Sequence, residues 1–497
     1  MSRPSISPGA TAAVVVLGSM MTVLDTTVVN VALTRLAHEF DASLTTLQWV
    51  ATGYTLALAT VIPLTAWAIG RIGTKRLYML SIGLFTLGSA LAGLAWSTES
   101  LIVFRVVQGL GGGMVMPVGM TIMVRAAGPD RLGRMMTLMG LPVLIGPLAG
   151  PPLGGWLVDD VSWRWIFFLN VPIGALALLF AGRLFPREDP RGGARLDVPG
   201  LLALSPGLAL LIYGLATGGE RGDFTEPGAL LPSAAGVLLV AAFAVRALSA
   251  RHPLLDLRIL RRRTAGSGVA ALGFYTAAYF GSMMLLPLYY QVARGESATS
   301  AGLLGIPQAL ATGLTMQVSG RLLDRVAPGR IVLSGMATAL LGFTGFATQV
   351  GADTPYWRLI LPMVVMGVGV GSTMMPIMTA VNRGVPPGEV PVVSTLLGIV
   401  PQIGSSIGAA LVSVVLAGNM EDSLPEGTDT LGAVQGAGQD VREAIGPALA
   451  DAFQHTYVWP IALMALAVLP ALLLPRTRPE PVTPPSADRQ PPVEAAL

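Results

Sequence analysis

The sequence predicts an all-α polytopic membrane protein with fourteen spanning helices. Hydrophobic residues make up 53% of its 497 residues and charged residues only 12%, about half the charged fraction of soluble proteins. Its apolar stretches are long enough to cross a bilayer and are continuously apolar, which disfavours a strand barrel. Basic residues are also concentrated on one side of the predicted membrane, as expected for a multi-pass protein.

A bilayer-spanning helix needs about 20 apolar residues, and this criterion places each element in order. The predicted spans are 11–33, 47–69, 77–96, 100–124, 135–157, 164–184, 198–217, 228–246, 264–289, 299–319, 331–349, 357–381, 391–417 and 456–475. We expect residues 1–10 to be a cytoplasmic N-terminus. Residues 418–455 are expected to form an outer loop with a short helix broken at Gly446 and Pro447, and 476–497 a disordered cytoplasmic tail.

The loop charges orient these spans. With the N-terminus inside, about four times as many Lys and Arg residues lie inside as outside. We therefore expect both termini in the cytoplasm and the protein in the cell inner (cytoplasmic) membrane. The basic run at Arg258 and 261–263 is interpreted as a juxtamembrane cluster rather than as a nucleic-acid patch.

The chain repeats itself with an offset of about 254 to 259 residues. Residues 11–185 and 264–475 are therefore predicted to form two related six-helix bundles, with two inserted helices in 198–247. Because the inserted pair lies outside the repeat and is poor in polar side chains, we expect both helices to lie away from the central cavity. Repeated halves that enclose a midplane site are typical of secondary transporters.

Two ionisable residues, Asp25 and Arg105, lie well inside predicted spans. A charge at that depth costs on the order of 3 kcal/mol and normally faces a cavity or a partner. Burial favours a neutral carboxyl and a nearby cation favours a charged one, so a carboxyl balanced between them can carry protons. A static Asp–Arg pair that only holds helices together is the alternative. Asn30 is interpreted as a helix–helix hydrogen-bonding residue or a functional one.

Span 135–157 combines glycines with prolines. Gly146, Gly150 and Gly154 recur every four residues and predict a ridge that permits close helix approach, while Pro151 favours a bend. Gly155 extends this motif. The combination suits either a helix that moves around a central site or ordinary tight packing.

Short basic loops follow the second and tenth spans. Arg71 lies in the first, and Asp324 and Arg325 lie in the second. Arginines there can hydrogen-bond helix C-termini across a cytoplasmic seam and latch it closed. The alternative is that they only obey the positive-inside rule.

Several chemistries are not expected. The absence of cysteine excludes thiolate metal sites, and three scattered histidines, His38, His252 and His455, make a histidine metal site improbable. We expect no metal, no cofactor and no nucleic-acid partner. The glycines from Gly109 onward follow no strand, and the nucleotide-binding P-loop pattern is missing, which disfavours an ATP-driven pump.

Together these motifs make the chain resemble the major facilitator superfamily, and within it the fourteen-span drug:proton antiporters. The resemblance covers residues 11–475 and rests on 24–33, on 101–109 with Arg105, on Gly146 through Gly155, and on 163–174. It implies a role in proton coupling for Asp25 and Arg105. The chain departs from the family in its first basic loop, where Ala66 and Gly70 replace the usual glycine and aspartate.

We therefore expect no enzyme but a proton-coupled antiporter that exports hydrophobic small molecules by alternating access. An exporter of a lipid or an endogenous metabolite is the alternative, and a membrane sensor or enzyme is a further one. Expected partners are the cargo, protons and membrane lipids, with the protein as a monomer. Aromatic and methionine side chains suit adaptable apolar binding. The expected cavity residues are Trp49, Tyr54, Tyr275, Tyr279, Phe280, Met283 and Met284.

Overall fold

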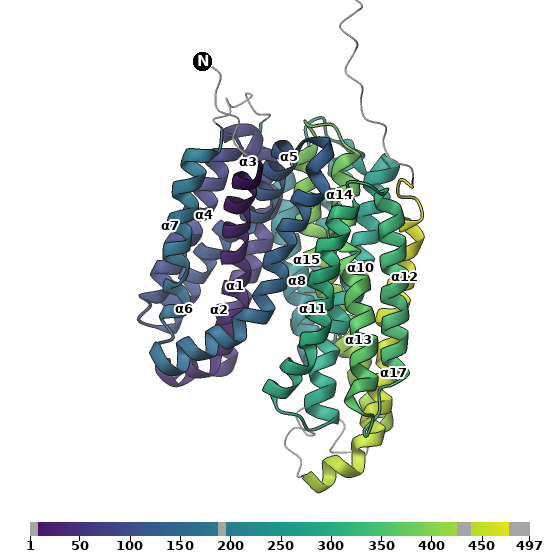
Figure 1. The fold of residues 1–497 in the computed structure, drawn as a ribbon. Helices are drawn as coiled ribbons and strands as arrows, with labels where there is room; N and C mark the ends of the chain where they lie inside the picture. The colour runs from purple at the N-terminus through teal and green to yellow at the C-terminus, as the bar shows by residue number, and fades with distance from the viewer. Residues whose placement is uncertain (1–7, 187–194, 425–438, 477–497) are drawn as a thin grey trace, which may run out of the picture.

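The computed structural model describes residues 8–186, 195–424 and 439–476, and within these ranges the chain contains helices and no strand (Figure 1). Twelve helical segments among the described residues are long and apolar enough to cross a membrane. The predicted all-helical membrane fold is therefore confirmed.

The first half of the chain forms one bundle of helices. Its elements are α1 (Pro8–Phe40), α2 (Leu44–Val61), η1 (Ile62–Leu64), α3 (Thr65–Ile72), α4 (Thr74–Gly93), α5 (Thr98–Trp156), the π-helical turn η2 (Leu157–Val161), α6 (Trp165–Phe168) and α7 (Asn170–Leu184). Pro63 lacks a backbone donor, and η1 interrupts the second span at this proline.

The second half begins after two inserted helices, α8 (Val198–Arg221) and α9 (Pro227–Ser249). Its elements are η3 (Leu257–Arg261), α10 (Arg263–Leu288), the π-helical turn η4 (Tyr289–Ala293), α11 (Ala298–Leu322), α12 (Pro328–Ala347), α13 (Tyr356–Gly371), α14 (Met374–Arg383), α15 (Val390–Ser423) and α17 (Gln439–Ala471). α17 continues through Pro447, so the expected break at Gly446 and Pro447 is wrong. The predicted features in 1–7, 425–438 and 477–497 lie outside the described residues.

Helix α5 crosses the bundle twice, because its two parts contact α1 in opposite directions. In the first part, Arg105 bonds to Asp25 and Gly119 lies against Val15, so this part runs antiparallel to α1. In the second part, Gly146 lies against Val23 and Gly154 against Val28, so this part runs parallel to α1. A straight helix of 59 residues would be about 88 Å long and could not make both sets of contacts.

The two halves meet at one end of the molecule. Leu323, directly after α11, lies against Gly133 of α5, and the Asn382 amide of α14 points to the Met120 sulfur of α5 at 3.6 Å. This is the end at which α1 begins, and the bundles diverge toward the other end (Figure 1). The structure therefore has its inter-half contacts on the side that the charge pattern predicts to be cytoplasmic.

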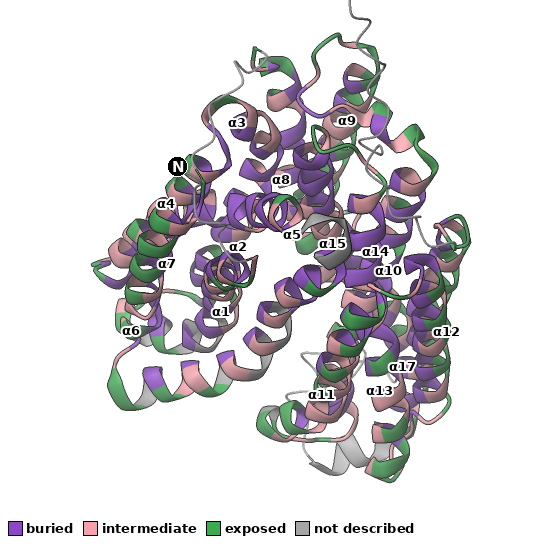
Figure 2. Ribbon diagram, turned by 45° about the horizontal axis from the view of Figure 1, so that its top comes forward, coloured by how far each residue is buried: buried purple, intermediate pink, exposed green. Residues whose placement is uncertain are grey.

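The inserted helices differ from each other. α9 packs on α8, and only 17% of its most apolar stretch is buried. α8 is far more enclosed, because it packs against α2 of the first half and α15 of the second (Figure 2). The prediction that both inserted helices lie away from the centre of the protein is therefore wrong for α8.

Candidate functional site

A buried polar cluster lies inside the first bundle. Arg105 Nη1 of α5 lies 2.5 Å from Asp25 Oδ2 of α1, and both side chains are at most 1% exposed. Gln108 and Asn170 each donate an amide hydrogen bond to Asp25 Oδ1, at 2.8 and 2.9 Å. All three neighbours are donors, so the cluster is arranged around a charged carboxylate.

Four helices position this cluster. Asp25 comes from α1, Arg105 and Gln108 from the first part of α5, and Asn170 from the first turn of α7. Ser89 of α4 completes it, since its hydroxyl donates to the Phe167 carbonyl and accepts from the Asn170 amide at 3.0 Å. Neither Gln108 nor Asn170 is among the residues predicted from sequence to form the site. The available signal was an amide side chain within an otherwise apolar stretch.

Arg105 is held by more than its ion pair. Its Nε donates to the Val50 carbonyl at 3.2 Å, and its Nη1 also donates to the Gln108 side-chain oxygen at 2.8 Å. The guanidinium carbon lies 4.0 Å from the centre of the Tyr54 ring, within cation–π range. These contacts fix the charge at the border between the cluster and a cavity.

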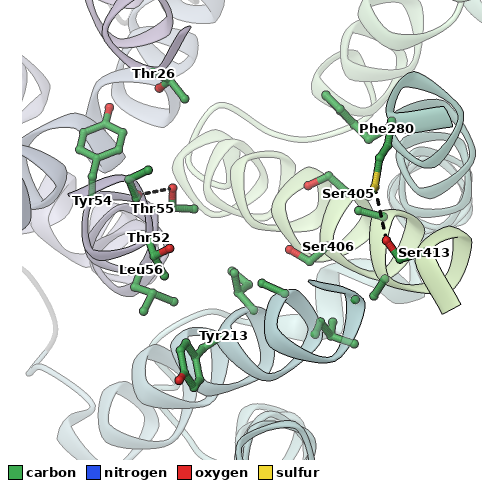
Figure 3. A pocket seen from close by; sticks show the side chains of 18 of the residues that line it. Thr26, Thr52, Tyr54, Thr55, Leu56, Tyr213, Phe280, Ser405, Ser406 and Ser413 are labelled. Atoms are coloured by element: carbon green, nitrogen blue, oxygen red, sulfur yellow. Dashed lines mark hydrogen bonds between the residues drawn. The ribbon is translucent and has the colours of Figure 1, made fainter. Parts of the chain in front are cut away.

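A cavity of about 500 Å³ lies between the two halves, a size typical of sites for small organic molecules. Its walls come from α1, α2, α5, α8, α10 and α15 (Figure 3). The lining residues are Thr26, Val29, Ala51, Thr52, Tyr54, Thr55, Leu56, Arg105, Ile212, Tyr213, Leu215, Ala216, Gly219, Phe280, Met284, Ser405, Ser406, Ala409, Ala410 and Ser413. Arg105 thus connects the cavity with the polar cluster.

The predicted cavity residues are distributed over two places. Tyr54, Phe280 and Met284 line the cavity between the halves. Tyr275, Tyr279 and Met283 instead line a second cavity of about 250 Å³, which is enclosed mainly by helices of the second half. Trp49 is absent from both linings and stacks on Tyr213 of α8, with ring centres 5.7 Å apart.

Helix α8 forms one wall of the larger cavity, contrary to the prediction that it lies away from it. Five of its residues, between Ile212 and Gly219, line the cavity. Gly219 permits this position because a Cβ there would lie 3.2 Å from the Ala410 Cα of α15. The few polar side chains of α8 suggested a lipid-facing helix, but the wall of a cavity for apolar molecules is apolar as well.

The predicted glycine ridge packs against α1. A Cβ at Gly146 or Gly150 would collide with Val23 or with the Thr27 hydroxyl, while one at Gly155 would meet nothing within 4 Å. The Thr27 hydroxyl also donates to the Gly146 carbonyl at 3.1 Å. The ridge therefore brings the second part of α5 next to the helix that holds Asp25. The side chains of Pro151 and Asn30 lie outside the described residues.

The family model for the Major Facilitator Superfamily matches residues 15–409, which is most of the chain. The chain belongs to this superfamily. It is 39% identical over 487 residues to the Multidrug resistance protein B homolog of Mycobacterium tuberculosis, covering 94% of this chain and 90% of that protein. It is 29% identical over 400 residues to the Multidrug export protein EmrB of Escherichia coli, covering 80% and 78%.

Solved structures of the superfamily share the fold. A double tryptophan mutant of XylE gives a TM-score of 0.63 at 13% identity, covering 95% of this chain and 96% of that one. The human organic anion transporter MFSD10 gives 0.59 at 16% identity, covering 93% and 100%. Membership in the superfamily, together with the relatives named as multidrug resistance and export proteins, makes this chain a transporter and not an enzyme.

The basic loops of this superfamily member differ between the halves. Arg71 at the end of α3 is exposed, and so is Arg325. Asp324 pairs with Arg383 of α14 at 3.5 Å, which is a contact within the second half. Gly109 lets α5 approach α2 closely in the first half, since a Cβ there would lie 2.5 Å from the Tyr54 carbonyl of α2.

Proposed function

We propose that the chain exports hydrophobic small molecules across the cytoplasmic membrane in exchange for protons. Family membership supports transport, and the names of the relatives, multidrug resistance and multidrug export proteins, support a drug cargo. The observation that carries proton coupling is a buried Asp25 carboxylate bonded to Arg105, which itself lines the cavity.

Asp25 is proposed to carry the proton. Three side chains donate hydrogen bonds to its carboxylate, so a proton placed on Asp25 would face donors and would displace at least one of them. Protonation would also leave Arg105 as an unpaired cation at the cavity wall. Loading of a proton would therefore change both the helix contacts of α1 and the charge that a cargo meets.

The cavity supports an apolar or weakly polar cargo. Aliphatic and aromatic side chains line it together with hydroxyls such as those of Thr52, Ser405 and Ser406. Among the described lining residues, Arg105 is the one with a charged side chain, and Asp25 neutralises it. Export of a lipid or an endogenous metabolite would use the same cavity and stays the alternative.

We further infer fourteen membrane crossings, with both termini in the cytoplasm and a monomeric protein. The twelve apolar helices would be joined by the second part of α5 and by α11, which is 25 residues long. The inferred units are 11–185, 198–247 and 264–475. Contacts at the predicted cytoplasmic end support an outward-facing state in alternating access.

The test is Asp25→Asn in inverted vesicles with an imposed pH gradient. We expect pH-driven uptake of cargo to be abolished, because asparagine cannot exchange a proton. Asp223→Asn is the matched control, since this acid lies in the loop between α8 and α9 and bonds to Thr225. Full active transport by Asp25→Asn would contradict the assignment, and equal loss in both variants would indicate a general defect.

A further inference from the structure

The smaller cavity is separated from the larger one by α10. Adjacent residues of this helix face different cavities: Tyr279 and Met283 line the smaller one, whereas Phe280 and Met284 line the larger one. The remaining walls of the smaller cavity come from α5, α11, α13 and α14. It is therefore a separate compartment, enclosed mainly by the second half with α5 of the first half as one wall, and not an extension of the space beside Arg105.

Its lining has a distinct chemistry. Asp, Glu, Lys, Arg and His are all absent from the described residues that line it. Four methionines, Met283, Met316, Met374 and Met375, face it together with two tyrosines. Methionine side chains adapt to ligands of different shape, and aromatic rings offer apolar faces. Charged ligands would lose their hydration here without gaining a partner.

Two stacked tyrosine rings lie at the smaller cavity, and an exposed methionine marks its entrance. Tyr275 and Tyr279 stack with ring centres 6.0 Å apart, and the Tyr275 hydroxyl donates to the Val370 carbonyl at 3.4 Å. This bond occupies the phenolic proton of Tyr275, which is fully buried, so the half-buried ring of Tyr279 is the more accessible of the two. Met283 is 43% exposed, so the cavity can be reached from outside the protein. On α11, Gly302 and Gly305 line the cavity, and a Cβ at either would meet nothing within 4 Å.

We propose that this cavity is a second binding site, specific for an uncharged hydrophobic group. At about 250 Å³ it holds one small apolar molecule or one limb of a larger one. A cargo molecule and the acyl chain of a lipid share this chemistry. Either would bind independently of the proton site, because α10 stands between the two cavities.

The test uses an uncharged photoactivatable phenyl diazirine with the purified full chain, followed by peptide mapping. We expect labelling at Gln308, Thr312 and Met316 that excess unlabelled phenyl compound suppresses, because a site saturates. Leu310 and Leu314 on the same helix are 52% and 70% exposed, so their labelling should resist competition and serves as an internal control.

Gly305→Leu fills the cavity where space is open, so the fold should be retained. We expect the suppressible labelling to fall about tenfold or more, the change that ~1.4 kcal/mol of lost apolar contact produces. Gly83→Leu on α4 is the matched control, since a Cβ there also meets nothing within 4 Å. Unchanged suppressible labelling in Gly305→Leu, or its absence from the unmodified chain, would overturn the proposal.

A competition arm distinguishes the two sources. Suppression by an exported dye assigns the site to cargo, and suppression by short-chain phosphatidylcholine alone assigns it to lipid; suppression by neither overturns the proposal. The labelling needs no pH gradient and no transport. Failure of Asp25-dependent export would therefore leave this result unaffected, and the two proposals can fail separately.

Discussion

The two halves of the molecule share a helical plan but carry different chemistry at matching positions. Offsets of 254 and 258 residues place Tyr279 and Met363 where the first half has Asp25 and Arg105. Met363 is fully buried and accepts from the Tyr290 hydroxyl at 3.4 Å, whereas Arg105 is held by an ion pair. The comparison teaches that charge handling is concentrated in one half, while the other offers adaptable apolar surface.

What the halves have in common is the glycine ridge. Gly146 and Gly150 of α5 pack against α1, and at an offset of 258 residues Gly404 and Gly408 of α15 pack against α10. A threonine hydroxyl meets a glycine in both ridges, Thr27 in the first half and Thr276 in the second. Close helix approach is therefore a property of both halves, whereas the Asp25–Arg105 pair is present in the first half alone among the described residues.

The largest effect is expected from replacing Arg105 with methionine, the residue type at the matching position of the second half. Arg105→Met leaves Asp25 buried without its cation, and breaking such a pair costs about 3–5 kcal/mol unless the acid neutralises itself. We expect transport to be lost and the thermal unfolding temperature to fall. Met363→Leu is the matched change in the second half and should cost under about 1.5 kcal/mol. Similar losses in both variants would contradict the asymmetry.

A smaller effect is expected at the ridge. Gly150→Leu places a side chain against Thr27, so we expect transport to fall while cargo binding is partly retained. Gly155→Leu meets open space and should behave like the unmodified chain. Transport and equilibrium dye binding should be measured on the same preparations. A Gly150→Leu protein that does not insert would favour static packing over movement.

Helix α8 belongs to neither half, and its aromatic residue should influence selectivity. Tyr213→Ala removes a ring from the cavity wall, so we expect the apparent KM for a planar aromatic cargo to rise about 3- to 10-fold. An aliphatic cargo should change less. Leu202→Ala on the same helix is the control, because Leu202 is 64% exposed. An equal change for both cargos would show that α8 only braces the bundles.

The smallest effect concerns the attachment of the inserted pair. Burial opposes ionisation of Asp197, but hydrogen bonds from Arg246, Gly200 and Leu254 hold the pKa of this carboxyl below its ordinary value. Its stabilising contribution is therefore present above the unfolded pKa and lost as pH falls through the folded one. We expect Asp197→Asn to lower the unfolding temperature at neutral pH and to flatten its acid dependence, whereas Asp256→Asn in the next loop should not.

Much of this could be predicted from sequence, because depth in a membrane makes a lone charge conspicuous. Asp25 and Arg105 stand out in this way as ionisable residues inside spans, and the structure pairs them; the ridge of Gly146, Gly150 and Gly154 follows from its spacing. Gln108 and Asn170 were not assigned, since a neutral amide carries too little cost to stand out. The predicted position of α8 is wrong because an apolar helix fits a bilayer and an apolar cavity equally well.

The position of α8 between the halves has a consequence for how affinity changes during transport. It touches α2 through the stacked rings of Trp49 and Tyr213 and α15 through a backbone contact at Gly219. A rotation of the halves against each other would shear one of these contacts, and the wall that α8 supplies would then separate from one half of the cavity. A cargo would then meet two sites of unequal strength made from the same residues. Such differential affinity is the condition under which a conformational equilibrium can be coupled to a ligand.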